Sequence, residues 1–242
     1  MTWAWHICFR CFTVALVFIT VASAAAVNGR VELVSSQDSN VRKHSDYSGV
    51  VVWLEPASGA PVLPASAGRA QMVQKNKTFT PHVLAITVGS VVDFPNFDPI
   101  FHNAFSNYNG QVFDIGLYPP GTTRSLAFHS EGVVRVFCNI HPSMSAVIVV
   151  LKSPYFTTSA RNGSFEIQHV PGGSYRLHVF HERAAERTLA ALTRTIDVSD
   201  APVEPLSLQI SESGYLELPH KNKYGKDYPP AGDASGYAGN KP

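Results

Sequence analysis

Residues 132–151 read Gly-Val-Val-Arg-Val-Phe-Cys-Asn-Ile-His-Pro-Ser-Met-Ser-Ala-Val-Ile-Val-Val-Leu, and much of the predicted fold follows from them. Runs rich in β-branched residues at Gly132–Phe137 and Ala146–Leu151 predict two strands. The loop between the strands carries a thiol, an imidazole and a thioether, at Cys138, His141 and Met144. The stretch therefore predicts a strand, a loop with three soft or borderline metal donors, and a second strand.

The rest of the chain after residue 26 repeats this β pattern. Short β-branched and aromatic runs alternate with Gly, Pro, Asn and Ser turns, and no helical stripe of useful length appears, which predicts an all-β protein. The expected upstream strands are Gly29–Val34, Gly49–Leu54, Val83–Val88, Ser90–Phe94 and Thr122–Phe128. Together with the two strands above, they predict one seven-stranded sandwich over residues 27–152.

A second, smaller sandwich is expected over residues 153–213. Its predicted strands are Gly163–Gln168, Ser174–Phe180, Thr195–Val198 and Leu206–Ile210, with a hairpin turn at Pro171–Gly173. About 60 residues is near the lower limit for an independent core, so this sandwich is expected to lean on the first. Residues 214–242 are rich in Gly, Pro, Lys and Asn with few aliphatic side chains, which predicts a disordered tail.

The N-terminus has the pattern of a secretory signal over residues 1–26. Arg10 precedes an apolar run from Cys11 to Val21, and Ala22-Ser23-Ala24 forms a small-residue cleavage site, so cleavage is expected after Ala24 or Ala26. A retained membrane anchor is the alternative, but the apolar core is shorter than the roughly 20 residues that a spanning helix needs. We therefore expect a periplasmic or secreted protein with no membrane span after cleavage.

Cysteine usage makes one thiol informative. Removal of the signal takes Cys8 and Cys11 and leaves Cys138 alone, so the mature chain forms no internal disulfide. A lone thiol in an oxidising compartment is expected to be buried or to bind a metal. The formal net charge of +1, with Lys and Arg scattered, makes nucleic acid an unexpected partner.

The loop donors are of the kind that copper prefers. Two imidazoles and a thiolate in a plane, with a distant axial thioether, suit a copper ion that cycles between oxidation states. The second imidazole is expected from His102, in Asp98-Pro99-Ile100-Phe101-His102-Asn103, and the Asn103 amide is expected to brace the ligand loop by hydrogen bonding. Zinc is the alternative metal, but Met is a poor zinc ligand.

This pattern resembles the copper site of the cupredoxins over roughly residues 80–152. The short Cys-x2-His-x2-Met spacing is closer to amicyanin than to plastocyanin or azurin, and the wider pattern from Phe94-Pro95-Asn96 resembles periplasmic cupredoxin-domain proteins of the methylamine-utilisation type. The resemblance implies a Greek-key β-sandwich with one type 1 copper site that transfers single electrons. The implied ligands are His102, Cys138, His141 and Met144.

The same resemblance implies a carrier and not an enzyme, with a transient redox partner protein and no small-molecule substrate. Residues 160–175 resemble the carboxypeptidase regulatory-like (transthyretin-like) sandwich. The presence of this second domain is a departure from the small cupredoxins, which end soon after the axial Met.

Two other functions remain open from the sequence. One is a periplasmic copper chaperone or storage protein, although the chain has just three Met residues and chaperones commonly offer Met- or His-rich sites. The other is an envelope interaction protein with a vestigial copper site, against which the intact ligands argue. A contribution of His82 to the site also stays open, and the remaining histidines are interpreted as surface, loop or tail residues.

Overall fold

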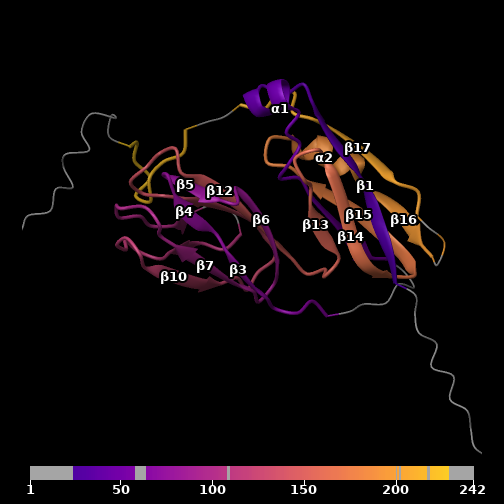
Figure 1. Cartoon of the computed structure of the whole chain (residues 1–242), viewed down its shortest axis with the longest axis horizontal. Helices are drawn as coiled ribbons and strands as arrows, with labels where there is room; N and C mark the ends of the chain where they lie inside the picture. Colours follow the sequence, from indigo (N-terminus) through magenta and orange to yellow (C-terminus); the bar gives the residue numbers. More distant parts are fainter. Residues whose placement is uncertain are drawn as a thin grey trace, which may run out of the picture.

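The computed structural model describes residues 24–57, 64–107, 110–199, 201, 203–216 and 219–228. Over these residues the chain forms two β-sandwiches that lie side by side (Figure 1). Helix is limited there to α1 (Ser39–His44) and α2 (Glu186–Leu192). The all-β prediction is confirmed.

The first sandwich holds the quoted stretch and lies within residues 69–151. One sheet has the order β6 (Val83–Thr87), β12 (Ser145–Leu151), β11 (Gly132–Phe137), β8 (Phe105–Ser106) and β9 (Phe113–Asp114). The facing sheet has the order β10 (Thr123–Ala127), β7 (Val91–Pro95) and β3 (Arg69–Gln71), and β4 (Val73–Lys75) pairs with β5 (Thr78–Thr80). Its buried core includes Phe94, Phe128, Val136 and Ile148.

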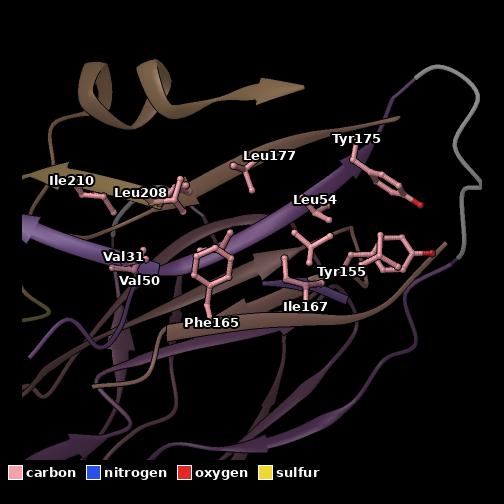
Figure 2. Close-up of a cluster of buried hydrophobic side chains, with 14 of the residues drawn as sticks. Val31, Val50, Leu54, Tyr155, Phe165, Ile167, Tyr175, Leu177, Leu208 and Ile210 are labelled. Carbon is pink, nitrogen blue, oxygen red and sulfur yellow. The ribbon is translucent and has the colours of Figure 1, made fainter. Parts of the chain in front are cut away.

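The second sandwich combines strands from both ends of the chain. One sheet has the order β14 (Ser164–Pro171), β1 (Ala24–Val34) and β17 (Leu206–Ser211). The other has the order β13 (Phe156–Thr158), β2 (Val51–Pro56), β15 (Gly173–Phe180) and β16 (Arg194–Val198). Figure 2 shows the apolar side chains that fill the space between them, and the labelled ones are Val31, Val50, Leu54, Tyr155, Phe165, Ile167, Tyr175, Leu177, Leu208 and Ile210.

The two N-terminal strands lie in a different sandwich from the one predicted. β1 pairs antiparallel with β14 and parallel with β17, and β2 lies between β13 and β15. The placement of both strands in a unit of residues 27–152 is therefore wrong, and residues 24–56 belong with those after 153. The physical reason is that alternating apolar residues reveal a buried face but not which sheet covers it.

Close packing fixes β1 in this position. A Cβ atom on Gly29 would lie 2.3 Å from the carbonyl oxygen of Leu206 and 2.6 Å from the ring of Phe165. Only a residue without a side chain allows β1 to approach both neighbours so closely.

The predicted hairpin at Pro171–Gly173 is also wrong. β14 ends at this turn and β15 begins there, but β14 pairs with β1 whereas β15 pairs with β2 and β16. The Pro-Gly-Gly sequence indicates a turn, and that turn carries the chain from one sheet to the other.

An apolar interface joins the two sandwiches. Alternate residues of β12 point to opposite sides, so that Ala146 and Ile148 enter the first core while Val147 and Val149 face the second sandwich. Val51 of β2 belongs to the same interface cluster as Val147 and Val149. The second sandwich therefore covers the outer face of the strand that follows the ligand loop.

Two further predictions concern the ends of the chain. Residues 1–23 of the expected signal lie outside the described residues, and β1 begins at Ala24, within the predicted 1–26 segment. Neither described helix is long and apolar enough to cross a membrane.

The disordered-tail prediction is wrong for residues 219–228, which contact the ligand loop through hydrogen bonds and ring stacking. Composition misled here because polar and aromatic contacts order this segment without aliphatic burial. The rest of the predicted tail after residue 228 lies outside the described residues.

Candidate metal centre

The ligand loop, residues 138–144, is closed by its own backbone. β11 and β12 pair in antiparallel register up to Phe137 and Ser145, so the loop begins and ends at adjacent points. The Cys138 N–H donates to the Met144 carbonyl at 3.1 Å, and the Met144 N–H donates to the His141 carbonyl at 3.1 Å. These bonds bring the two ends of the loop together and turn it back on itself.

His102 lies on a separate segment of the chain, which faces the ligand loop. Its N–H donates to the Tyr118 carbonyl at 3.2 Å and its carbonyl accepts from the Tyr118 N–H at 2.9 Å. Tyr118 is fully buried, and its hydroxyl donates to the Phe94 carbonyl of β7 at 2.8 Å. This two-way bridge to a core tyrosine fixes the backbone that carries the imidazole.

The structure brings three of the four predicted ligands together. The Nδ1 atom of His102 lies 3.8 Å from the Cys138 sulfur, and the Nδ1 atom of His141 lies 3.7 Å from it. All three donor atoms lie within 4.8 Å of one another, and among the described residues this is the one such cluster of His, Cys, Asp or Glu. His102 and Cys138 are fully buried, while His141 is partly exposed.

The donor separations fit a single metal ion. Metal–nitrogen and metal–sulfur bonds of about 2.1 and 2.3 Å, the lengths found for zinc, place the two donors about 3.8 Å apart in a trigonal plane. The two observed imidazole–sulfur distances agree with this value. The residues present are therefore suited to hold a first-row transition metal between them.

Met144 is fully buried and packs in the same core cluster as Cys138. The loop bonds described above fix its backbone beside that of Cys138. Its role as fourth ligand stays a prediction.

Asp98 orients the His102 ring. Its carboxylate lies 2.8 Å from His102 Nε2, so this nitrogen donates and Nδ1 is left to face the sulfur. Asp98 in turn accepts from the backbone N–H groups of Asn76 at 2.6 Å and Lys77 at 2.8 Å. Sequence reasoning missed this role, and the available signal was an aspartate four residues before the predicted ligand.

Asn103 braces the loop as predicted. Its side-chain oxygen accepts from the Asn139 N–H at 2.6 Å, immediately after Cys138. Its amide nitrogen lies 3.4 Å from a carboxylate oxygen of Asp114. The two segments that carry His102 and Cys138 are thus joined by a direct hydrogen bond.

The surroundings favour an ionised thiol. Burial raises the pKa of Cys138, but contacts with His102 and His141 and with the backbone N–H groups of Asn103 and Ile140 outweigh burial and lower it to about 6. Burial likewise raises the pKa of Asp98, yet the bonds from Lys77, His102 and Asn76 leave it below its ordinary value. A thiolate and an oriented imidazole are the states that a metal requires.

His82 lies outside this cluster. Its Nε2 is 2.7 Å from the Glu182 carboxylate of the second sandwich, and its Nδ1 is 3.1 Å from the Ser145 carbonyl. The Glu182 hydrogen bond raises the pKa of His82 against the effect of burial. Its contacts link the two sandwiches.

His181 departs from the predicted surface position because it is buried against Glu212. The prediction failed because a histidine that follows a strand can face inward toward a carboxylate as readily as outward toward water.

Large apolar side chains are exposed on the segments that flank His102. Phe97 and Phe101 are 61% and 51% exposed, and Leu117, next to the bridging Tyr118, is 47% exposed. Exposed apolar groups of this size commonly mark a contact surface. They lie on the same segments that position one predicted ligand.

Part of the chain is similar in sequence to a known protein. Over 81 residues, 33% of this chain, it is 33% identical to the methylamine utilization protein MauL of Methylorubrum extorquens, and the match covers 71% of that protein. No family profile matches the chain.

Two solved structures are also similar to parts of the chain. A purple cupredoxin from Nitrosopumilus maritimus matches 34% of this chain and 99% of its own, at 28% identity and a TM-score of 0.31. Amicyanin from Paracoccus versutus matches 40% and 97%, at 20% identity and a TM-score of 0.32. Because the chain is 33% identical to MauL over 71% of that protein, it belongs to the family of the methylamine utilization protein MauL.

Proposed function

We propose that this protein is an exported blue-copper protein that carries single electrons. The observation that carries the proposal is the triad of His102 Nδ1, Cys138 Sγ and His141 Nδ1, whose imidazole–sulfur distances are 3.8 and 3.7 Å. Bound copper supplies a centre that gains and loses one electron, and two imidazoles with a thiolate are donors suited to it. Met144 is the proposed fourth donor.

The residues around the site support a fixed geometry. His102 is held by Asp98, the loop is closed by the Cys138–Met144 backbone bond, and Asn103 ties the two ligand segments together. A ligand set held in this way undergoes little rearrangement when the charge of its metal changes, which is what a carrier requires.

Burial of the site favours a carrier over a chaperone or storage protein. Cys138, His102 and Met144 are each fully buried, and just one predicted ligand, His141, reaches the surface. A protein that hands over metal needs its donors accessible to an acceptor. Electrons can instead pass through the partly exposed His141 edge.

The proposed partner is a redox protein that docks transiently, and no substrate is transformed. Phe97, Phe101 and Leu117 offer exposed apolar surface on the segments around His102. Redox encounters commonly use small interfaces of this kind.

Visible absorption of the copper-loaded protein tests the proposal. We expect one copper per chain and an intense thiolate-to-copper band in the oxidised protein, which Cys138→Ser abolishes. Ser143→Ala, an exposed residue of the same loop, is the matched control and should keep the band. Tight Cu(I) binding with no such band after oxidation, together with metal transfer to acceptors, would instead favour copper handling.

A further inference from the structure

The C-terminal strap, residues 219–228, follows the second sandwich in the sequence but contacts the first. The chain leaves the second sandwich at the end of β17, and the strap then lies against the ligand-loop end of the first sandwich (Figure 1, in yellow). Its contacts are with residues 78 to 109 positions earlier in the sequence. The strap is thus a long-range connection between the end of the described chain and the candidate metal centre.

Two side chains of the strap bind carbonyl groups of the ligand loop. The Tyr228 hydroxyl donates to the Cys138 carbonyl at 2.7 Å. His220 Nε2 lies 2.7 Å from the Pro142 carbonyl, and because a carbonyl only accepts, the imidazole donates. The bonded carbonyls belong to the predicted ligand Cys138 and to Pro142, directly after the predicted ligand His141.

Aromatic stacking adds to these bonds. The His220 ring stacks on Phe137, the residue before Cys138, with ring centroids 4.1 Å apart and an interplanar angle of 26°. The Tyr228 ring meets His220 edge to face at 5.2 Å.

Lys223 ties the middle of the strap to the same site. Its N–H donates to the Asn139 side-chain oxygen at 3.0 Å, and its ammonium lies 2.7 Å from the Asp114 carboxylate. Asp114 also contacts Asn103, the residue that braces the loop. The strap therefore reaches Cys138, Asn139 and Pro142 from outside while Asn103 holds the loop from inside.

From this arrangement we infer that Tyr228 and His220 are positioning residues for the metal-ligand loop. Their hydrogen bonds hold the loop conformation before a metal binds, and they limit its movement afterwards. The inference rests on the proposed function for its meaning in electron transfer, but the contacts themselves join protein groups and include no metal. A loop held from both sides keeps its donors in place at little conformational cost.

The test compares Tyr228→Phe and His220→Phe with Tyr224→Phe in the full mature chain. Tyr228→Phe keeps the ring and removes the donor, and His220→Phe keeps a ring to stack on Phe137 but removes the bond to Pro142. Tyr224 lies in the same strap and is 70% exposed, so Tyr224→Phe is the matched control. In the metal-free protein we measure the rate at which iodoacetamide alkylates the buried Cys138, located by peptide mass spectrometry.

We expect the two strap variants to raise the alkylation rate by about three- to tenfold, as loss of one hydrogen bond predicts, and the control to match the wild type. In the copper-loaded protein the same variants should keep the visible band, release copper faster by a similar factor and shift the reduction potential. Circular dichroism establishes that each variant is folded.

The outcomes separate the two proposals. If the wild type shows no thiolate-to-copper band, the proposed function fails, while the alkylation rates still test the strap. If the band is present and both variants match Tyr224→Phe in alkylation, copper release and potential, the positioning role is overturned. A variant that unfolds is replaced by Lys223→Ala, which removes the ammonium contact with Asp114 and should raise the alkylation rate in the same direction.

Discussion

At the scale of single residues, the site depends on side chains that do not themselves face the proposed metal. Asp98 holds one nitrogen of His102 so that the other faces Cys138, and Asn103 holds the backbone after Cys138. Both act through hydrogen bonds to ligand-bearing segments. Their removal should therefore alter the site while leaving its donors in the chain.

Replacement of Asp98 tests this orientation. Asp98→Asn keeps the side-chain size but replaces the charged carboxylate that accepts the His102 Nε2–H by a neutral amide. We therefore expect copper affinity to fall by about 10- to 100-fold. Competition with a copper chelator measures the change. Asp197→Asn, an exposed position on β16, is the control and should leave affinity unchanged. Equal affinities in the two variants would remove Asp98 from the site.

Replacement of Met144 tests its role as the axial donor. Met144→Leu should keep copper and raise the reduction potential, because a thioether donor that favours the oxidised metal is lost. Met72→Leu is the control, since Met72 is equally buried in the same core cluster. Cyclic voltammetry measures both variants. A shift in Met72→Leu as large as in Met144→Leu would show that repacking of the core causes the change.

At the scale of elements, a buried polar cluster joins the ends of three strands in the second sandwich. Glu212 after β17 accepts from Ser36 at 2.5 Å and lies 2.7 Å from His181 Nε2 and 3.0 Å from Arg183. Burial raises the pKa of Glu212, but its bonds to His181, Arg183 and Ser36 outweigh burial and lower it to about 2. The ionised carboxylate therefore stabilises the fold.

Because the pKa of Glu212 is lowered in the folded protein, the free energy of unfolding depends on pH. The folded pKa lies below the ordinary value of 4.5, so the stabilisation is present above about pH 4.5 and is lost as the pH falls toward 2. Between about pH 6 and pH 3 the free-energy advantage of the wild type over Glu212→Gln should shrink by about 2 kcal/mol. Urea unfolding at several pH values measures it, with Glu204→Gln as control. An advantage that stays constant with pH would contradict the assignment.

The sequence alone predicts some of the strands and misses others. The β-branched runs predicted β11 without error and β12 to within one residue, since both strands carry strong local signals. Short strands such as β8 and β13 were missed because two or three residues give no periodicity. Which sheet receives β1 or β2 depends on contacts distant in the sequence, and local pattern carries no information about those contacts.

In the candidate site, too, residues close together in the sequence could be predicted, whereas contacts distant in the sequence could not. Cys138, His141 and Met144 lie within seven residues, so their proximity could be predicted from spacing, and His102 from its resemblance to a known motif. Tyr228 reaches the Cys138 carbonyl across 90 positions of sequence. Nothing in the composition of that segment distinguishes a residue that docks from one that stays in water.

At the scale of the whole molecule, the two sandwiches depend on each other. Val147 and Val149 of β12 are covered at the interface to which Val51 of the second sandwich belongs, and His82 contacts Glu182 across it. The second sandwich also leads into the strap that contacts the ligand loop. The ligands lie in one sandwich, but their loop is also held by the strap, which follows the second sandwich in the sequence.

This dependence predicts the behaviour of a shortened chain. A fragment of residues 27–152 keeps all four predicted ligands but separates β1 and β2 from β14, β15 and β17, which cover them. Exposed apolar strands associate readily, so we expect aggregation. Size-exclusion chromatography of this fragment beside the full mature chain measures the outcome. A monomeric fragment with a cooperative unfolding transition would contradict the shared architecture.

The most direct test of the proposed site is the position of copper in a crystal of the loaded, full mature chain. Anomalous scattering measured on either side of the copper absorption edge locates the ion independently of any assumption about its ligands. We expect one strong peak bonded to His102 Nδ1, Cys138 Sγ and His141 Nδ1, with Met144 as the fourth neighbour. A peak elsewhere, such as beside His82 or His220, with the triad free of metal, would contradict it.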